Sequence, residues 1–290
     1  MKVLTRSEVV IIDSNLLEST PTFELGREYH KDDKVHSDKY VYVALSDNVN
    51  KPLTDVLSWK KVGTSNQWAC FDYYLNTSCI AEDELDISFS CFGAKSIYIS
   101  NIEAKFLSIE VIDVRNAQVI EEQTYKLYGQ NISSWSEYFF GNWGKKYRHH
   151  IYYERNTFTR NIIFRVRAWG IRDIKIGSII CGDLIELGIS LYADNSISML
   201  DFSKVLTDEE GNTSLTKGNF KRTNAFNVLV SDDEMDKVSY ELAELRGQAV
   251  VFIIANNYEC LMSFGFLKNH EILLSKVGAS IVSIEIEGLI

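Results

Sequence analysis

The sequence has little proline and no closely spaced cysteines. Only two prolines occur among 290 residues, and the five cysteines form no CxxC motif. Structural zinc sites and disulfide frameworks depend on such spacings, so we expect no metal and no disulfide scaffold. The widely separated cysteines instead predict buried, reduced thiols in a protein made in a cytoplasm. They are Cys70, Cys79, Cys91, Cys181 and Cys260.

The chain also lacks a long apolar run and an excess of basic residues. Its first apolar run, Val9 to Ile12, ends at Asp13 and is too short for a signal peptide or a membrane span. The formal net charge of -10 would repel a phosphate backbone, and the one basic cluster is KKYRHH at residues 145–150. We therefore expect no membrane span and no nucleic-acid partner.

Common catalytic motifs are missing as well. The sequence contains no P-loop, dinucleotide fingerprint, GxSxG or HExxH. The acidic runs at 82–84 and 208–210 lie in polar surroundings that predict solvated loops, and residues 208–212 predict a hairpin turn rather than a calcium loop. His149 and His150 are adjacent, so on a strand they would point to opposite faces and could not share a metal. We expect no enzyme and no cofactor, although a pair of carboxylates across a cleft would still support glycoside hydrolysis.

Short β-branched and aromatic runs recur along the whole chain. Aromatic residues make up 12% of it, and runs such as YVYVAL, FLSIEVIDV and SIVSIEIEGLI are bounded by turn residues. Such runs are typical of strands. The run FRVRAW alternates as a half-buried antiparallel strand does. One face of this strand would carry Phe164, Val166 and Ala168. The other face would carry Arg165, Arg167 and Trp169.

One segment, SDDEMDKVSYELAELRG at residues 231–247, predicts a helix. Ser231 is a suitable N-cap, three acidic residues follow it in the first turn, and Gly247 is a suitable terminator. An apolar stripe is expected to pack this helix against a sheet. The stripe consists of Met235, Val238, Leu242 and Leu245.

The fold class expected is mainly β, in three segments, because the chain exceeds the usual length of one core. Residues 1–63 should hold a lead strand and a small β module. Residues 64–181 should form a β-sandwich or jelly roll without a helix. Residues 182–290 should form a C-terminal α+β domain, barrel-like and with one helix. Its last strand, VSIEIEGLI, should pair within the domain or with a neighbouring subunit, because an uncovered edge would recruit other chains.

The stretch from Phe23 to Gly63 resembles the small carbohydrate-binding modules of chitinases. The pattern of that family is an aromatic residue, Y-x-x-G-D-x-V, an aromatic strand, a proline-containing loop and a closing W-x-x-V. Asp32 stands where the family has glycine. The matching residues are Phe23, Tyr29, Asp33, Val35, Tyr40, Tyr42, Pro52, Trp59 and Val62.

The stretch WKKVGTSNQWACFD, residues 59–72, is similar to a segment of tailed-bacteriophage tail proteins that joins such a module to a β-sandwich. SSWSEYFFG and IKIGSIICGDLIELG resemble later parts of that sandwich, and the C-terminal third resembles the last domain of those proteins. The matching residues of the joining segment are Trp59, Gly63, Asn66, Trp68, Phe71 and Asp72.

This resemblance implies a structural protein of a phage tail tip or baseplate, assembled in the host cytoplasm and located in the virion tail. Its partners would be other tail or baseplate proteins, further copies of itself in a homo-oligomer, and host-surface glycans as candidate ligands. Sugar rings stack on exposed aromatic side chains, so Tyr40, Tyr42 and Trp59 are the candidate carbohydrate-binding residues. The alternative is that these rings form the core of so small a module; this is the favoured role for Trp59 and Tyr42, and Tyr40 suits either role. The alternative function is a carbohydrate-active enzyme or lectin with an appended chitin-type module.

Overall fold

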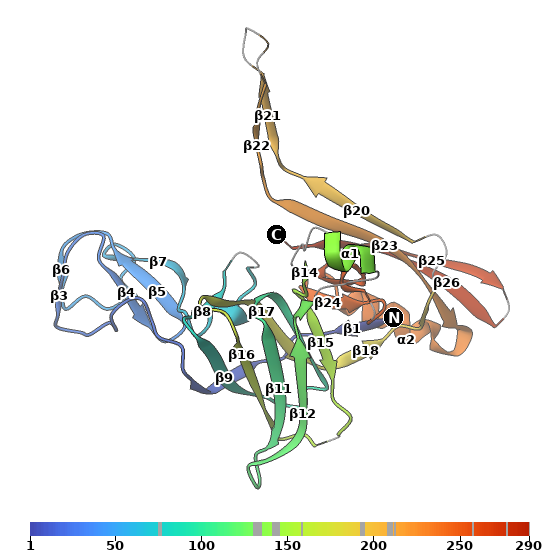
Figure 1. The fold of residues 1–290 in the computed structure, drawn as a ribbon, viewed down its shortest axis with the longest axis horizontal. Helices are drawn as coiled ribbons and strands as arrows, with labels where there is room; N and C mark the ends of the chain where they lie inside the picture. The colour runs from blue at the N-terminus through green and yellow to red at the C-terminus, as the bar shows by residue number, and fades with distance from the viewer. Residues whose placement is uncertain are drawn as a thin grey trace.

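The protein is mainly β, as predicted. A computed structural model describes residues 1–74, 77–129, 135–140, 146–157, 159–191, 195–207, 211, 213–256, 258–276 and 278–289. Figure 1 shows a small module at one end, a β-sandwich in the middle, and a large sheet at the other end from which a narrow arm projects.

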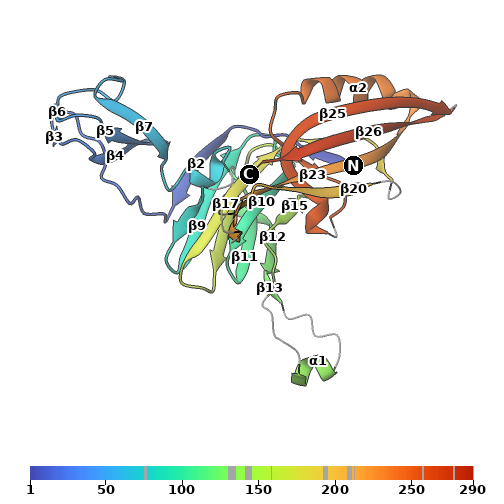
Figure 2. The ribbon, with the colours of Figure 1, turned by 90° about the horizontal axis from the view of Figure 1, so that it is seen from above.

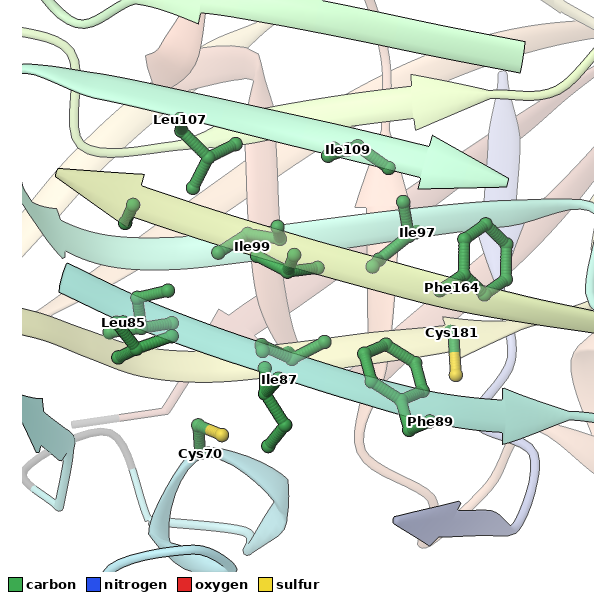
Figure 3. Packing of buried hydrophobic residues seen from close by; sticks show 14 of the residues in the cluster. Cys70, Leu85, Ile87, Phe89, Ile97, Ile99, Leu107, Ile109, Phe164 and Cys181 are labelled. Atoms are coloured by element: carbon green, nitrogen blue, oxygen red, sulfur yellow. The ribbon is translucent and has the colours of Figure 1, made fainter. Parts of the chain in front are cut away.

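The sandwich consists of two antiparallel sheets with an apolar core between them. The five-stranded sheet has the order β12-β11-β16-β9-β2, and the four-stranded sheet has the order β15-β10-β17-β8. Figure 3 shows leucine, isoleucine and phenylalanine side chains from both sheets meeting in this core. The strands are β2 (Val9–Ser14), β8 (Cys79–Ala81), β9 (Glu84–Cys91), β10 (Ser96–Glu103), β11 (Phe106–Asp113), β12 (Gln118–Lys126), β15 (Ile151–Glu154), β16 (Ile162–Trp169) and β17 (Ile174–Gly182).

The alternation predicted for β16 is confirmed. Burial alternates at every residue of the strand, with Phe164, Val166 and Ala168 facing the core. On the outer face, the Arg165 guanidinium pairs with Asp86 on the neighbouring strand. The period of two in the sequence therefore gives one apolar face and one charged face.

The C-terminal part is an open sheet of eight strands rather than the expected barrel-like domain. The hydrogen-bonded path runs β18-β1-β24-β25-β26-β23-β19, with β20 also on β23, and the described strands do not close it. The expected pairing of the last apolar strand is confirmed, because β26 lies between β25 and β23. The strands are β1 (Lys2–Leu4), β18 (Leu184–Glu186), β19 (Ile189–Ser190), β20 (Ser196–Asp201), β23 (Phe220–Ser231), β24 (Val250–Ile253), β25 (Met262–Lys276) and β26 (Ala279–Gly288).

The predicted helix covers one face of this sheet (Figure 2). A single 3-10 turn, η2 (Asp232–Glu234), leads into α2 (Met235–Glu244). Three of the four predicted stripe residues are buried against the sheet, Met235 is half-buried there, and Gly247 has a φ of +71° just beyond the helix. The cap differs from the prediction, since the Ser231 hydroxyl lies 3.4 Å from the Glu234 carboxylate and makes no capping bond to the backbone.

The opposite face of the same sheet packs on the sandwich. Leu4 of β1 and Val251 of β24 contact a cluster that includes Tyr98 of β10 and Ile180 of β17. Neighbouring residues of β10 and β17, such as Ile97 and Ile179, point into the sandwich core instead. Strands β10 and β17 therefore have apolar side chains on both faces and join the two cores.

The small module is an insertion, so its boundaries differ from the predicted segment 1–63. Of that segment, β1 pairs in the C-terminal sheet and β2 pairs in the sandwich. The module proper follows Glu18 and ends before Asn66. A lead strand cannot be assigned to one sheet from its own sequence, because any edge of suitable polarity accepts it. Its strands are β3 (Glu28–Tyr29), β4 (Lys34–Ser37), β5 (Tyr40–Ala44), β6 (Asn48–Val49) and β7 (Trp59–Thr64).

The remaining elements are short. The helix α1 (Trp135–Phe140) lies in SSWSEYFFG, so the prediction that residues 64–181 contain no helix is wrong. In a six-residue segment with four aromatic residues, propensity alone does not separate strand from helix. None of the helices in the described ranges is long and apolar enough to cross a membrane. The others are η1 (Ala69–Phe71), β13 (Tyr128–Gly129), β14 (Lys146–Tyr147), β21 (Lys204–Thr207), β22 (Thr213–Thr216) and η3 (Glu259–Leu261).

Candidate functional site

One candidate site is a cleft of 840 Å³ where the module meets the sandwich. One wall comes from β5 and β7 of the module, and the other from residues 6–9 and the chain around η1. A cavity of this volume is large enough for a small oligosaccharide.

Of the three predicted carbohydrate-binding residues, only Tyr40 lines this cleft. Trp59 is 3% exposed and belongs to the module core, so it offers no surface to a ligand. Tyr42 is half-buried and packs against the same core. For Trp59 the alternative of a structural ring is therefore correct, and its assignment to a binding surface is wrong.

The burial of Trp59 follows from the size of the module. Its ring meets the rings of Phe23 and Tyr29 edge-on, with centroids 5.5 and 5.1 Å apart, and its indole N–H donates to the Lys51 carbonyl at 3.1 Å. A unit this small needs large side chains to fill its interior. Asp32, which replaces the family glycine, has a φ of +71°, a left-handed conformation that aspartate tolerates better than most residues.

Sequence reasoning missed the aromatic residues of the opposite wall. Trp68, Tyr73 and Tyr74 line the cleft, and the two tyrosines are well exposed. Two adjacent tyrosines after a tryptophan, in WACFDYY, were the available signal, because aromatic side chains that gather on a surface mark binding sites.

Three cations lie over rings of this cleft. Lys61 Nζ is 3.1 Å from the centroid of the Tyr40 ring, and Lys39 Nζ is 4.2 Å from that of Trp68. The Arg6 guanidinium is 4.2 Å from the Tyr73 centroid and donates to the Asp72 carbonyl at 3.1 Å. Positively charged side chains therefore lie over three of the aromatic rings of the cleft.

Asp72 organises the floor between these walls. Its carboxylate accepts hydrogen bonds from the hydroxyls of Thr64 at 3.1 Å and Thr77 at 2.8 Å, and from the Tyr74 N–H at 2.8 Å. Thr64 belongs to the module, whereas the other two residues follow η1. The Asp72 side chain thus ties the module to the segment that carries the exposed tyrosines.

A second contact fixes the module at its neck. The Glu18 carboxylate accepts from the backbone N–H groups of Asn66 and Gln67, at 2.8 and 3.0 Å. The Asn66 amide in turn donates to the carbonyls of Leu17 and Ile80, at 2.8 and 2.9 Å. These bonds hold the outgoing and returning chains side by side.

A second cavity, of 780 Å³, lies between the sandwich, the C-terminal sheet and the base of the arm. His149 and His150 line it but contact different groups: His150 shares a 3.0 Å hydrogen bond with Tyr98, and His149 one of 3.0 Å with the Ile102 carbonyl. Burial, and then the nearby charge of Arg222, lower the pKa of His150 to about 4. The expectation that the two histidines point to opposite faces of a strand is wrong, because both line this cavity and neither lies in a strand.

Four of the cysteines lie in two buried pairs, and the fifth is exposed. Cys70 donates its backbone N–H to the Cys79 sulfur at 3.1 Å, and Cys91 lies beside Cys181. Burial raises the pKa of Cys70 and of Cys181. Cys260 is exposed, so the prediction of a buried thiol is wrong there.

The other candidate groups take no part in either cavity. Glu82, Asp83 and Glu84 are exposed, as predicted; the first two lie in the bend before β9 and Glu84 begins that strand. Residues 208–210 and 212 of the predicted hairpin turn lie outside the described residues. Within the described ranges, no group of three or more histidine, cysteine or acidic side chains is arranged to hold a metal ion.

Comparison with known proteins gives no relative to set beside this geometry. The chain matches no protein-family model, no curated protein and no solved structure.

Proposed function

We propose that the protein is an oligomeric structural component of a bacteriophage tail tip or baseplate, and that its inserted module binds glycans of the host surface. The resemblance of residues 59–72 to tail proteins supports the first part. The aromatic cleft around Tyr40 supports the second. The observation that carries the assembly role is the apolar arm.

The arm consists of β20, β21 and β22 together with the start of β23, and it projects from the body of the molecule (Figure 1). Every residue of β20, β21 and β22 is exposed. Large apolar side chains recur along it: Ile197, Met199, Leu200, Phe202, Val205, Leu206, Leu215 and Phe220. An apolar surface of this extent on a monomer is typical of a protein–protein interface.

A second copy of the chain is the partner that this arm fits best. A two-stranded ribbon is marginally stable in water, so β21 and β22 need a surface to lie on. The tip of the arm, β21 and β22, stands away from the body (Figure 1). In a ring each tip can lie on the next subunit, a head-to-tail contact that closes when the rotation between subunits allows it.

Light scattering after size-exclusion chromatography tests the assembly role. Val205 and Leu215 are directly opposite each other in the ribbon, so the pair V205D and L215D places two charges on it. We expect this variant to lose oligomers while its melting temperature stays within a few degrees of the wild type. The control is Ser214→Asp on the same ribbon, where a polar residue is already exposed. A wild-type protein that is monomeric at micromolar concentration, or a double variant that assembles normally, contradicts the proposal.

Glycan hydrolysis is the alternative role of the cleft, because Glu8 and Asp72 both line it. A glycosidase needs one carboxyl group to donate a proton and another to act as nucleophile or base. Asp72 is instead surrounded by donors from Thr64, Thr77 and Tyr74, which suits a structural role. We expect no release of reducing sugar from bacterial glycans by the pure protein, and turnover abolished by Glu8→Gln would establish the alternative.

A further inference from the structure

We infer that the module cleft selects acidic glycans, whose sugars carry carboxylate, sulfate or phosphate groups, over neutral chitin-type sugars. This inference rests on the proposed glycan-binding role and specifies its ligand class. It follows from what covers the aromatic rings, from the pairing of the cations, and from the charge of the rest of the chain.

Three of the rings on which a neutral sugar would stack are already in contact with cations, whereas no described cation lies over the exposed ring of Tyr74. Lys61 lies over Tyr40, Lys39 over Trp68 and Arg6 over Tyr73. A neutral pyranose that stacks on the same ring faces must first displace these groups and forfeit the cation–π contacts. An acidic sugar can instead contact the ammonium or guanidinium group while the ring stays covered.

The lysines of the cleft have no carboxylate partner in the part of the chain that the structure describes. Lys39 and Lys61 form no ion pair there. Asp72 is directed at hydroxyl and N–H donors, and the Arg6 guanidinium donates to a backbone carbonyl rather than to a carboxylate. The cations are therefore available to a ligand.

The charge of this cleft opposes that of the whole protein. Three cations and two acidic residues line it, whereas the chain as a whole has 30 basic and 40 acidic residues. Two lysines of the cleft come from the module, and the arginine comes from the segment between β1 and β2. An anionic sugar bound between the walls contacts both, and such charge complementarity gives specificity.

Calorimetric titration of the full chain with matched tetrasaccharides tests the inference. The probes are tetragalacturonic acid, with carboxylates; a sulfated heparin tetrasaccharide; and chitotetraose, which is neutral. Tetraglutamate serves as an anion without sugar rings. We expect at least one acidic saccharide to bind tenfold or more tightly than chitotetraose and than tetraglutamate. Its affinity should fall as the salt concentration rises from about 50 to about 300 mM. This range brackets 0.15 M, where the Debye length is about 8 Å.

Neighbouring lysines on β7 provide a matched pair of variants. Lys61 lines the cleft and Lys60 does not, although both are exposed. We expect Lys61→Gln to weaken the acidic saccharide about three- to tenfold and Lys60→Gln to change it less than twofold. Equal or tighter binding of chitotetraose overturns the acidic preference but leaves glycan binding intact. Equal binding of tetraglutamate, or equal effects of the two variants, also overturns it. If no saccharide binds, the glycan-binding role fails with it, whereas the assembly role is measured separately by light scattering.

Discussion

At the scale of single residues, two nearby tryptophans have opposite roles. Trp59 is in the module core, whereas Trp68 lines the cleft. Hydrophobicity alone does not separate them. What separates them is which partner rings the fold supplies, since Phe23 and Tyr29 enclose Trp59 while Lys39 covers Trp68.

Thiol reactivity gives a first prediction at this scale. We expect an aromatic disulfide reagent to modify Cys260 quickly at pH 8 and the other four cysteines only after unfolding, because Cys260 is exposed and the others are inaccessible. Counting released thiolate with and without denaturant measures this. The Cys260→Ser variant should have almost no fast phase, and fast reaction of two or more thiols in the native wild type contradicts the prediction.

The buried His150 gives a second prediction, on pH dependence. Its pKa is about 4 in the folded chain, lowered by burial and by Arg222, against about 6.5 when unfolded. Between these values the unfolded state binds more protons, so stability falls as the pH drops from about 6.5 to 4 and this contribution is constant below that. The shift corresponds to roughly 3 kcal/mol.

Urea unfolding between pH 4 and 7 measures this effect. Carboxyl groups also titrate near pH 4, so the informative quantity is the difference between wild type and His150→Gln, which should lack most of the slope. His30→Gln, at an exposed position, is the control. Parallel pH profiles for the wild type and His150→Gln would show that His150 is not the group responsible.

At the scale of elements, α2 gives a third prediction. Leu242 is fully buried between the helix and the C-terminal sheet, so Leu242→Ala should lower the free energy of unfolding by about 2 to 5 kcal/mol. Tyr240→Ala on the exposed face of the same helix should cost less than about 1 kcal/mol. Denaturant melts of the full chain compare the two, and equal losses would mean that the helix packs differently.

The sequence predicts a helix or strand well where a single hydrophobic period runs along it. It predicts poorly where the position of a strand depends on the strands that it pairs with. The alternation of β16 and the stripe of α2 each identify a buried face without knowledge of the fold. In contrast, β1 is only three residues long, and its place between β18 and β24 depends on strands that are distant in sequence. For the same reason the sequence predicts only one wall of the cleft. Tyr40 lies within the module, whereas Trp68 and Tyr73 are brought close to it only by the fold.

At the scale of the whole molecule, the sandwich and the C-terminal sheet should unfold together. They share the cluster around Tyr98 and Val251, whereas the module has a small core of its own and is attached at a neck near Glu18 and Asn66. Replacing residues 20–64 by a short Gly-Ser linker should therefore leave the remainder folded, because a brief loop closes at little entropic cost.

Differential scanning calorimetry of the wild type and of this excised chain measures the prediction. The excised protein should keep one cooperative transition within about 5 °C of the main wild-type transition, keep its oligomeric state, and lose binding of saccharides. In contrast, deletion of residues 1–63 should prevent folding, since it also removes β1 and β2. An excised chain that is soluble but monomeric, beside an oligomeric wild type, would place the module in the assembly interface.

The position of β1 has a consequence for protein synthesis. Lys2 pairs with Ile253, so β1 leaves the ribosome long before its partner strand β24 is made. Until then one edge of β1 is unpaired, and Val3 and Leu4, both fully buried in the finished sheet, are available to chaperones or to other nascent chains. A polypeptide that stops before β24 can complete the sandwich strands but not the sheet from which the arm projects. Premature termination before β24 thus yields fragments without the finished surface that we propose for assembly, and we expect such fragments to stay out of the oligomer.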